Sequence, residues 1–282
     1  MDIFTNAHVV GVANNTQKIC DAMDLDYETT KHCILAAYMH DVGKIKIPSA
    51  ILQKNGPLTD EEYEIMKLHT VYGYDIVMSY EQFKYLAPIV RGHHENLDGS
   101  GYPDGLKDEE ITEEAKLIKV ADVWDALTRK RQYKEAFSAS ESANIMICNV
   151  KDGKMGSKYL YYLLLVIVEE TIEKNNGNIY ELNKAKKDLE TLKELDVIYK
   201  QIYDRGYSTQ YANKLNRYNL SPGYDMTTNT ALLTRTKAKI ESLEKDIKFY
   251  KTEIVKLNKY CKEARRLIKP RERVTYLFGK RV

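Results

Sequence analysis

HHENLDGSGYP, residues 93–103, is the stretch that decides the fold of this chain. Two adjacent histidines end an apolar segment that reads as a helix, and an acidic, glycine-rich loop follows them. Neighbouring helix positions point about 100° apart, so His93 and His94 can bind two ions of a cluster or one ion from two sides. Gly99 and Gly101 permit positive φ values, which allows a tight loop. A capped helix end and a turn would explain the glycines, but not the paired histidines.

Composition limits the number of domains and the class of protein, but it does not indicate a binding partner. The 282 residues suit one large domain or one domain with an appendage, and the formal net charge of +2 carries no information about partners. The longest apolar run, residues 160–168, is too short to span a membrane, and no signal segment is recognisable. The cysteines are dispersed without a CxxC pair, which indicates reduced thiols in a cytoplasmic protein: Cys20, Cys33, Cys148 and Cys261.

Histidines and acids recur in a series of segments that read as successive helices. Taken alone, His8 would be an ordinary helix residue, and His40-Asp41 an ordinary polar helix end. Asp122, however, falls in a stretch that otherwise faces a core, and a buried carboxylate needs a cationic partner. Five imidazoles and two carboxylates could bind two metal ions: His8, His40, Asp41, His69, His93, His94 and Asp122. His32 is left over and reads as structural.

The mixed nitrogen and oxygen ligands favour iron or manganese over structural zinc, which prefers thiolates and a closed tetrahedron. Two metals can activate a bridging hydroxide for attack on a phosphodiester. Asp41, with two oxygens, suits the position between the ions. Lys44 could stabilise charge that develops on the phosphate, and Asp125, one helical turn after Asp122, could orient the water.

Five segments, in order, resemble one known family: HDVGKIKIP, ILQKNGPLTDEE, KLHTVYG, HHENLDGSGYPDGL and ADVWDALT. They resemble the HD-GYP subgroup of HD-superfamily phosphohydrolases over about residues 5–150. The resemblance implies an all-α fold, an HD-type helical bundle around a metal cluster. It also implies hydrolysis of cyclic di-GMP to linear pGpG or GMP. We therefore expect a catalytic domain at 1–150, with a closing helix that extends to about 175.

The resemblance also assigns roles to single residues. It makes six of the residues above metal ligands and matches His8 to an upstream histidine of the family. Lys44 matches a lysine near the reacting phosphate. The positions that match substrate contacts are Gly101, Tyr102, Pro103 and Arg131.

Three positions depart from the pattern of the family. Phe4 stands where members with three metals have a glutamate, which favours two metals here. Gly11 replaces a frequent arginine, and the usual DRPY is KRQY at residues 130–133, which keeps the arginine as Arg131 but replaces the proline with Gln132. These changes leave the predicted metal ligands in place but bear on substrate affinity.

Residues 176–282 read as a helical C-terminal region. Residues 181–203 form one helical stretch, and apolar residues at spacings of three and four form a heptad seam within 230–268. We expect a parallel homodimer in which Lys239 meets Glu244 of a second copy, with an intrachain hairpin as the alternative. The basic tail after Lys262 could contact nucleic acid or anionic lipid, but a solvated helix end is favoured.

Three functions remain open from the sequence. The first is a metal-dependent phosphodiesterase for cyclic di-GMP. The second is a non-catalytic receptor for a cyclic dinucleotide that signals through the C-terminal helices. The third is an HD phosphohydrolase for another cyclic or linear nucleotide. The complete set of candidate ligands favours the first.

Overall fold

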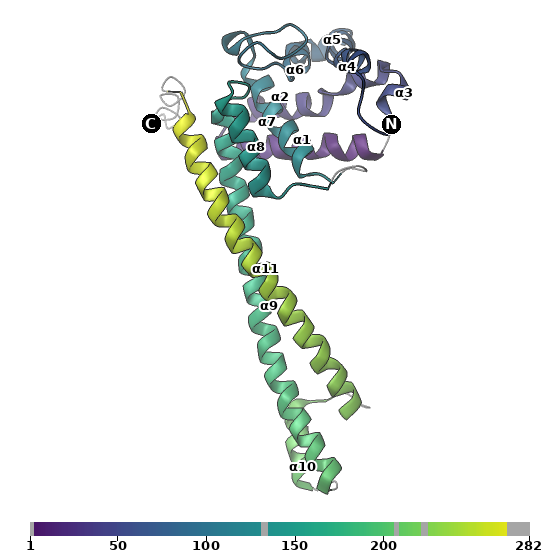
Figure 1. The fold of residues 1–282 in the computed structure, drawn as a ribbon, viewed down its shortest axis with the longest axis vertical. Helices are drawn as coiled ribbons and strands as arrows, with labels where there is room; N and C mark the ends of the chain where they lie inside the picture. Colours follow the sequence, from purple (N-terminus) through teal and green to yellow (C-terminus); the bar gives the residue numbers. More distant parts are fainter. Residues whose placement is uncertain (1–2, 131–134, 206–208, 221–224, 270–282) are drawn as a thin grey trace. The chain divides into compact units, whose positions relative to one another are not determined.

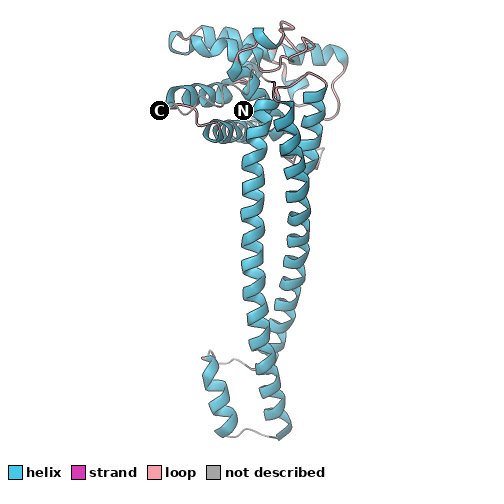
Figure 2. Cartoon of the chain, turned by 90° about the vertical axis from the view of Figure 1, so that its left-hand side faces the viewer, coloured by secondary structure: helices cyan, strands magenta, loops and turns pink. Residues whose placement is uncertain are grey.

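The computed structural model describes residues 3–130, 135–205, 209–220 and 225–269 (Figure 1). Within these ranges the regular structure is helical, and Figure 2 shows helices joined by loops without a strand. An isolated antiparallel bridge links Asp98 to Lys107. The all-α fold expected from the sequence is therefore confirmed. No helix in the described ranges is long and apolar enough to cross a membrane.

The chain divides into two compact units, which are described separately. Unit 1 contains residues 1–169 and 255–282, and unit 2 contains residues 170–254. Two long helices, α9 (Ser157–Arg205) and α11 (Met226–Leu267), contribute residues to both units. The domain limits at 150 and 175 that the sequence suggests remain a prediction.

Unit 1 holds most of the helices. In addition to the start of α9 and the end of α11, its elements are α1 (Ile3–Ala22), α2 (Tyr27–Met39), η1 (Val42–Lys46), α3 (Ser49–Leu52), α4 (Asp60–Lys67), α5 (His69–Met78), η2 (Glu81–Leu86), α6 (Ala87–Gly92), η3 (Asp108–Glu110), α7 (Glu113–Thr128) and α8 (Ala139–Lys151).

Polar caps define where several of these helices begin. Asp26 accepts a hydrogen bond from the backbone N–H of Thr29 at 3.0 Å before α2. Thr59 and Glu62 form a reciprocal capping box at α4, and Thr112 caps α7 at 3.2 Å. These side chains satisfy backbone N–H groups that have no partner within the helix. They fix where these helices begin; of the three helices, α2 is followed by His40 and α7 carries Asp122.

The stretch from Thr59 to about residue 79 reads as one helix from its sequence, but the structure divides it into α4 and α5 at Leu68. The backbone N–H of Leu68 bonds to the carbonyl of Ile65 at 3.2 Å, which tightens the end of α4. The division puts His69 in the first turn of α5. The apolar stretch before His93 is likewise divided into η2 and α6. Pro88 lies in the first turn of α6, where its missing N–H costs little.

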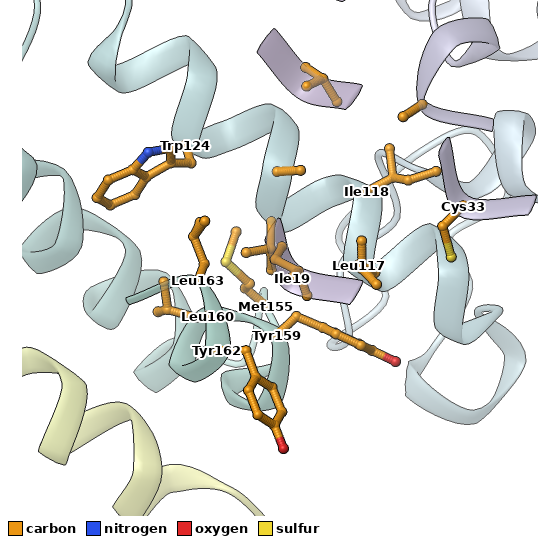
Figure 3. Close-up of a cluster of buried hydrophobic side chains, with 14 of the residues drawn as sticks. Ile19, Cys33, Leu117, Ile118, Trp124, Met155, Tyr159, Leu160, Tyr162 and Leu163 are labelled. Carbon is orange, nitrogen blue, oxygen red and sulfur yellow. The ribbon is translucent and has the colours of Figure 1, made fainter. Parts of the chain in front are cut away.

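The core of unit 1 surrounds α7. Leu117 and Ile118 of α7 are at most 1% exposed, and Figure 3 shows them with Ile19 of α1 and Leu160 and Leu163 of α9. Burying a side chain of this size stabilises a fold by about 1.5–3 kcal/mol. The end of α11 joins the same cluster through Leu257, Cys261 and Ala264.

Unit 2 contains an intrachain pair formed by α9 and α11. Between these two helices in the sequence lie α10 (Thr209–Leu215) and η4 (Asn216–Tyr218). Lys239 bonds to Glu181 at 2.8 Å, and Glu244 bonds to Lys186 at 2.9 Å. Asn229 donates to the carbonyl of Leu192 at 3.1 Å. Along α9 from Glu181 to Leu192, the contacts on α11 move back from Lys239 to Asn229, so the two helices are antiparallel. The structure thus shows the hairpin that the sequence left as the alternative, and the homodimer stays a prediction.

One continuous helix replaces the two separate helices expected around residues 159–170 and 181–203. It continues through Asn175 and Gly177. A glycine inside a helix costs only about 1 kcal/mol relative to alanine, so flanking turns that pack well override it.

We predict that Gly177→Ala raises the free energy of unfolding by about 0.5–1 kcal/mol, because alanine loses less backbone entropy in a helix. A Cβ built at Gly177 meets no atom within 4 Å, so the added methyl group has room. Urea denaturation followed by circular dichroism measures the change. Gly153→Ala is the control and should destabilise, since Gly153 has φ +74°. A loss of stability in Gly177→Ala would contradict the prediction.

Candidate metal centre

Five helices of unit 1 bring the predicted ligand residues together. His8 lies on α1, His40 ends α2, Asp41 precedes η1, and His69 begins α5. The remaining three come from the end of α6 and from α7: His93, His94 and Asp122. The ligand atoms form two groups, each with all atoms within 4.8 Å of one another: His8, His40 and Asp41 in one, His69, His93 and His94 in the other.

Asp41 lies between these two groups. Its Oδ2 is 3.2 Å from Nε2 of His40 and 3.6 Å from Nε2 of His8, whereas its Oδ1 is 3.5 Å from Nε2 of His69. Asp122 approaches Nε2 of His8 at 3.2 Å. A carboxylate with one oxygen toward each group of imidazoles has the arrangement needed to bridge two cations.

Backbone carbonyls orient three of the imidazoles. The Nδ1 atoms of His40, His69 and His93 lie 2.6, 2.8 and 2.7 Å from carbonyl oxygens three residues earlier in the chain. Nδ1 must donate to a carbonyl, which leaves the lone pair on Nε2 facing the centre in the neutral ring. The Nε2 of His40 is buried without a hydrogen-bond partner and faces the carboxylate of Asp41. A cation between these atoms would satisfy both, so the site fits a metal ion.

The protonation states also suit metal binding. Burial lowers the pKa of His94 to about 3, and burial together with the charge of His94 holds the pKa of His93 well below its usual value. Burial alone would raise the pKa of Asp41, but His40 and Lys44 outweigh it and hold that pKa well below the ordinary range. The two imidazoles are therefore neutral and the carboxylate is charged, which are the forms that bind metals.

His8 differs because acids surround it. Burial lowers its pKa, but hydrogen bonds to Asp122 and Asp125 outweigh this effect and raise the pKa of His8 to about 9. In the metal-free protein His8 therefore carries a proton that a cation would displace.

Asp125 orients His8, which is a different contact from the water that the sequence suggested. Its Oδ2 accepts from Nδ1 of His8 at 2.7 Å, and the guanidinium of Arg129 donates to both of its oxygens at 2.8 and 2.7 Å. Gly11 makes room for this pair, since a Cβ there would lie 1.9 Å from Oδ1 of Asp125 and 2.2 Å from Nη2 of Arg129. Arg129 was not among the predicted site residues; its spacing of four from Asp125 on a helix is the signal that could have found it.

Glu95 and Lys119 hold the loop that follows the paired histidines through hydrogen bonds. Glu95, which is 1% exposed, accepts hydrogen bonds from the backbone N–H groups of Asp104, Gly105 and Leu106 at 2.7, 3.1 and 3.0 Å. The Nζ of Lys119 donates to the carbonyl of Glu95. Neither residue was predicted from the sequence, although Glu95 lies inside the HHENLDGSGYP stretch.

The predicted substrate residues lie on this loop or outside the described ranges. Gly101 approaches the backbone closely, since a Cβ there would lie 2.2 Å from the backbone nitrogen of Asn96. The ring of Tyr102 lies 4.8 Å from that of His94, and a cis peptide bond joins Tyr102 to Pro103. Lys44 forms an ion pair with Asp41.

Some residues considered in the sequence analysis are not described by the structure, and one, His32, lies away from the ligand groups. Arg131 and Gln132 lie outside the described residues, as does the tail from 270 onward. Phe4 belongs to α1, but its side chain is not described. His32 belongs to neither group of ligand atoms and packs against Tyr85, with 4.6 Å between ring centroids.

Comparison with known proteins identifies several relatives. Residues 4–158 match the family model described as "HD domain". The cyclic di-GMP phosphodiesterase response regulator RpfG of Xanthomonas campestris is 42% identical over 135 residues, covering 47% of this chain and 34% of that protein. The 3'3'-cGAMP-specific phosphodiesterase 1 of Vibrio cholerae is 34% identical over 188 residues, covering 66% and 41%.

A cyclic di-GMP phosphodiesterase of Thermotoga maritima is 40% identical over 149 residues, covering 50% of this chain and 40% of that protein. The chain thus spans less than half the length of each of these relatives. The family model nevertheless covers more than half of this chain, including every predicted metal ligand. The chain therefore belongs to the HD domain family, whose members bind divalent metals, and within it to the HD-GYP subgroup that residues 93–103 resemble.

Proposed function

We propose that this chain hydrolyses cyclic di-GMP to linear pGpG or GMP, using two divalent metal ions, iron or manganese. The observation that carries the proposal is the position of Asp41 between two groups of imidazole nitrogens. Relatives named as cyclic di-GMP phosphodiesterases, at 40 and 42% identity, support the substrate class. The V. cholerae relative named for 3'3'-cGAMP makes that cyclic dinucleotide the second candidate.

We assign one set of residues to metal binding and another to contacts with the substrate. His8, His40 and Asp41 would hold one ion, and the second would be held by Asp41 with His69, His93 and His94. Asp122, beside His8, would complete the ligands. When bound, two divalent ions polarise a phosphodiester and lower the pKa of water, so that a nucleophile exists near neutral pH.

Lys44 and the loop would act on the substrate directly. The ammonium of Lys44 lies beside Asp41, where it can stabilise negative charge on the phosphate oxygens in the transition state. The carboxylate of Glu95 accepts backbone hydrogen bonds from the loop and would hold it in place, with Tyr102 next to His94. Asp125 and Arg129 keep His8 turned toward the centre.

A cytoplasmic location remains a prediction from the dispersed cysteines, of which Cys20, Cys33 and Cys261 are buried as free thiols. A homodimer through α11 also remains a prediction. It would have to form on the faces of the hairpin that Lys239 and Glu244 do not use for their intrachain pairs.

Anaerobic incubation of the Fe(II)- or Mn(II)-loaded protein with cyclic di-GMP tests the proposal. We expect linear product from the unmodified chain, and a rate at least roughly 100-fold lower from Asp41→Ala, which removes the ligand shared by both groups. Chromatography of the nucleotides gives the rates. Tight binding of the intact nucleotide without product would instead favour the receptor function. Turnover of 3'3'-cGAMP alone would favour the second substrate.

Arg129→Ala should weaken metal binding roughly 10-fold, because Arg129 holds Asp125, which orients the ligand His8, and such supporting contacts contribute about this much to affinity. Isothermal titration with Mn(II) measures the change. Lys130→Ala is the control: this neighbouring lysine pairs with Glu135, and both side chains are at least 72% exposed. Equal affinity of Arg129→Ala and the unmodified chain would show that Asp125 orients His8 without help.

The stability of the metal-free protein should fall as pH rises from about 6.5 to 9. The pKa of His8 is raised to about 9 in the folded state, so its contribution is complete below the unfolded value near 6.5 and is lost through pH 9. We expect a loss on the order of 2 kcal/mol from this group. Urea denaturation in the presence of a chelator measures it. His8→Asn should flatten the profile, and an unchanged slope in that variant would refute the assignment to His8.

A further inference from the structure

We propose that Tyr63, Glu64 and Lys67 of α4, together with Tyr102, form a subsite that binds the guanine base of the nucleotide. The inference rests on the proposed function and extends it from the phosphate to the base. Of these four residues, only Tyr102 was expected at the site from the sequence, and the sequence did not place any base contacts.

A row of rings leads outward from the metal centre. The ring of Tyr102 lies 4.8 Å from that of His94, and the ring of Tyr63 lies 6.4 Å beyond it in an edge-to-face arrangement. Tyr63 is 47% exposed, so a flat ligand can reach its face. In a nucleotide whose phosphate is at the metals, the sugar carries the base away from phosphorus in the same way. The row therefore begins at the reacting group and ends on an open aromatic surface.

Lys67 gives this surface a positive charge. Its Nζ lies 5.0 Å from the ring centroid of Tyr63 and 5.7 Å from that of Tyr102, within the range of cation–π contacts. Aromatic rings bind nucleobases by stacking, and a neighbouring cation strengthens the contact. A base that lies on Tyr63 is thus within reach of the ammonium of Lys67.

The partner of Lys67 selects guanine over adenine. Lys67 bonds to Oε1 of Glu64 at 2.6 Å, so an ammonium and a carboxylate stand side by side. Guanine offers acceptors at O6 and N7 and donors at N1 and its amino group, and these can match the lysine and the carboxylate respectively. Adenine carries an amino donor where guanine has O6, and this donor faces an ammonium without an acceptor.

The chain contains a matched copy of this group away from the centre. Tyr27, Glu28 and Lys31 of α2 repeat the pattern Tyr-Glu-x-x-Lys, with Lys31 5.9 Å over the ring of Tyr27 and 3.5 Å from Glu28. Tyr27 is 76% exposed and has no neighbouring ring within the described part of the chain. The group on α4 differs from this copy by its contact with Tyr102, so the copy serves as the control.

Binding of GMP and AMP, measured by isothermal titration on the Mn(II)-loaded chain, tests the proposal together with the turnover of cyclic di-GMP and cyclic di-AMP. We expect the unmodified chain to prefer GMP. Tyr63→Ala should weaken GMP binding roughly 10-fold, and Lys67→Ala should lower the preference for GMP over AMP by a similar factor. Lys31→Ala should bind and discriminate like the unmodified chain. Bound manganese and the melting temperature verify that each variant is folded.

The two proposals fail in different ways. A chain that hydrolyses cyclic di-GMP, but in which Tyr63→Ala keeps the affinity for GMP and Lys67→Ala keeps the preference for GMP over AMP, overturns the subsite and leaves the function. A chain that does not hydrolyse any cyclic dinucleotide, but prefers GMP and loses this preference in Lys67→Ala, overturns the function and supports the subsite. The same loss in Lys31→Ala would also overturn the subsite, because it would show a general effect of charge.

Discussion

The carboxylate of Asp41 is the constraint on which the centre depends. It is buried, and the ring nitrogens of three histidines and the ammonium of Lys44 lie within 3.6 Å of it. A buried charge is costly unless cations and hydrogen bonds surround it. The helices that meet here each present a nitrogen or an oxygen, and backbone carbonyls turn the imidazoles so that lone pairs point inward. A metal ion bound among the neutral imidazoles would give their inward lone pairs a partner, so metal binding would also stabilise the fold.

The sequence pointed to the histidines and aspartates that the structure brings together here, because candidate metal ligands leave a strong signal. The pairs His40-Asp41 and His93-His94 can be recognised in the sequence without any knowledge of how the helices pack. The contacts that support the ligands leave weaker signals. Arg129 reaches Asp125 only because Gly11, more than a hundred residues earlier in the chain, has no side chain. The spacing of four permits the pair of Asp125 and Arg129, but its room beside α1 depends on how α1 and α7 pack, which the local pattern does not contain.

The heptad seam of α11 shows a different limit. Apolar residues at spacings of three and four state that one face of the helix is covered, but they do not say by what. A second copy of the helix and a segment of the same chain would leave the same pattern. In unit 2, Asn229 is fully buried, and it donates to the backbone carbonyl of Leu192 on α9, which supports the hairpin. A buried amide needs such a partner, and its position on the other helix could not be read from the sequence.

The limits of unit 1 follow from packing rather than from motifs. The motifs end before residue 150, yet Leu257 and Ala264 of α11 are completely buried in the cluster that contains α7. Glu263 pairs with Lys151 at 2.6 Å, and Lys269 pairs with Asp108 at the start of η3. Asp108 follows Lys107, which bridges to Asp98 in the loop after the paired histidines. The end of α11 and the two residues after it are therefore part of the support for that loop, and a chain cut at residue 150 would expose apolar surface on the remaining helices of unit 1.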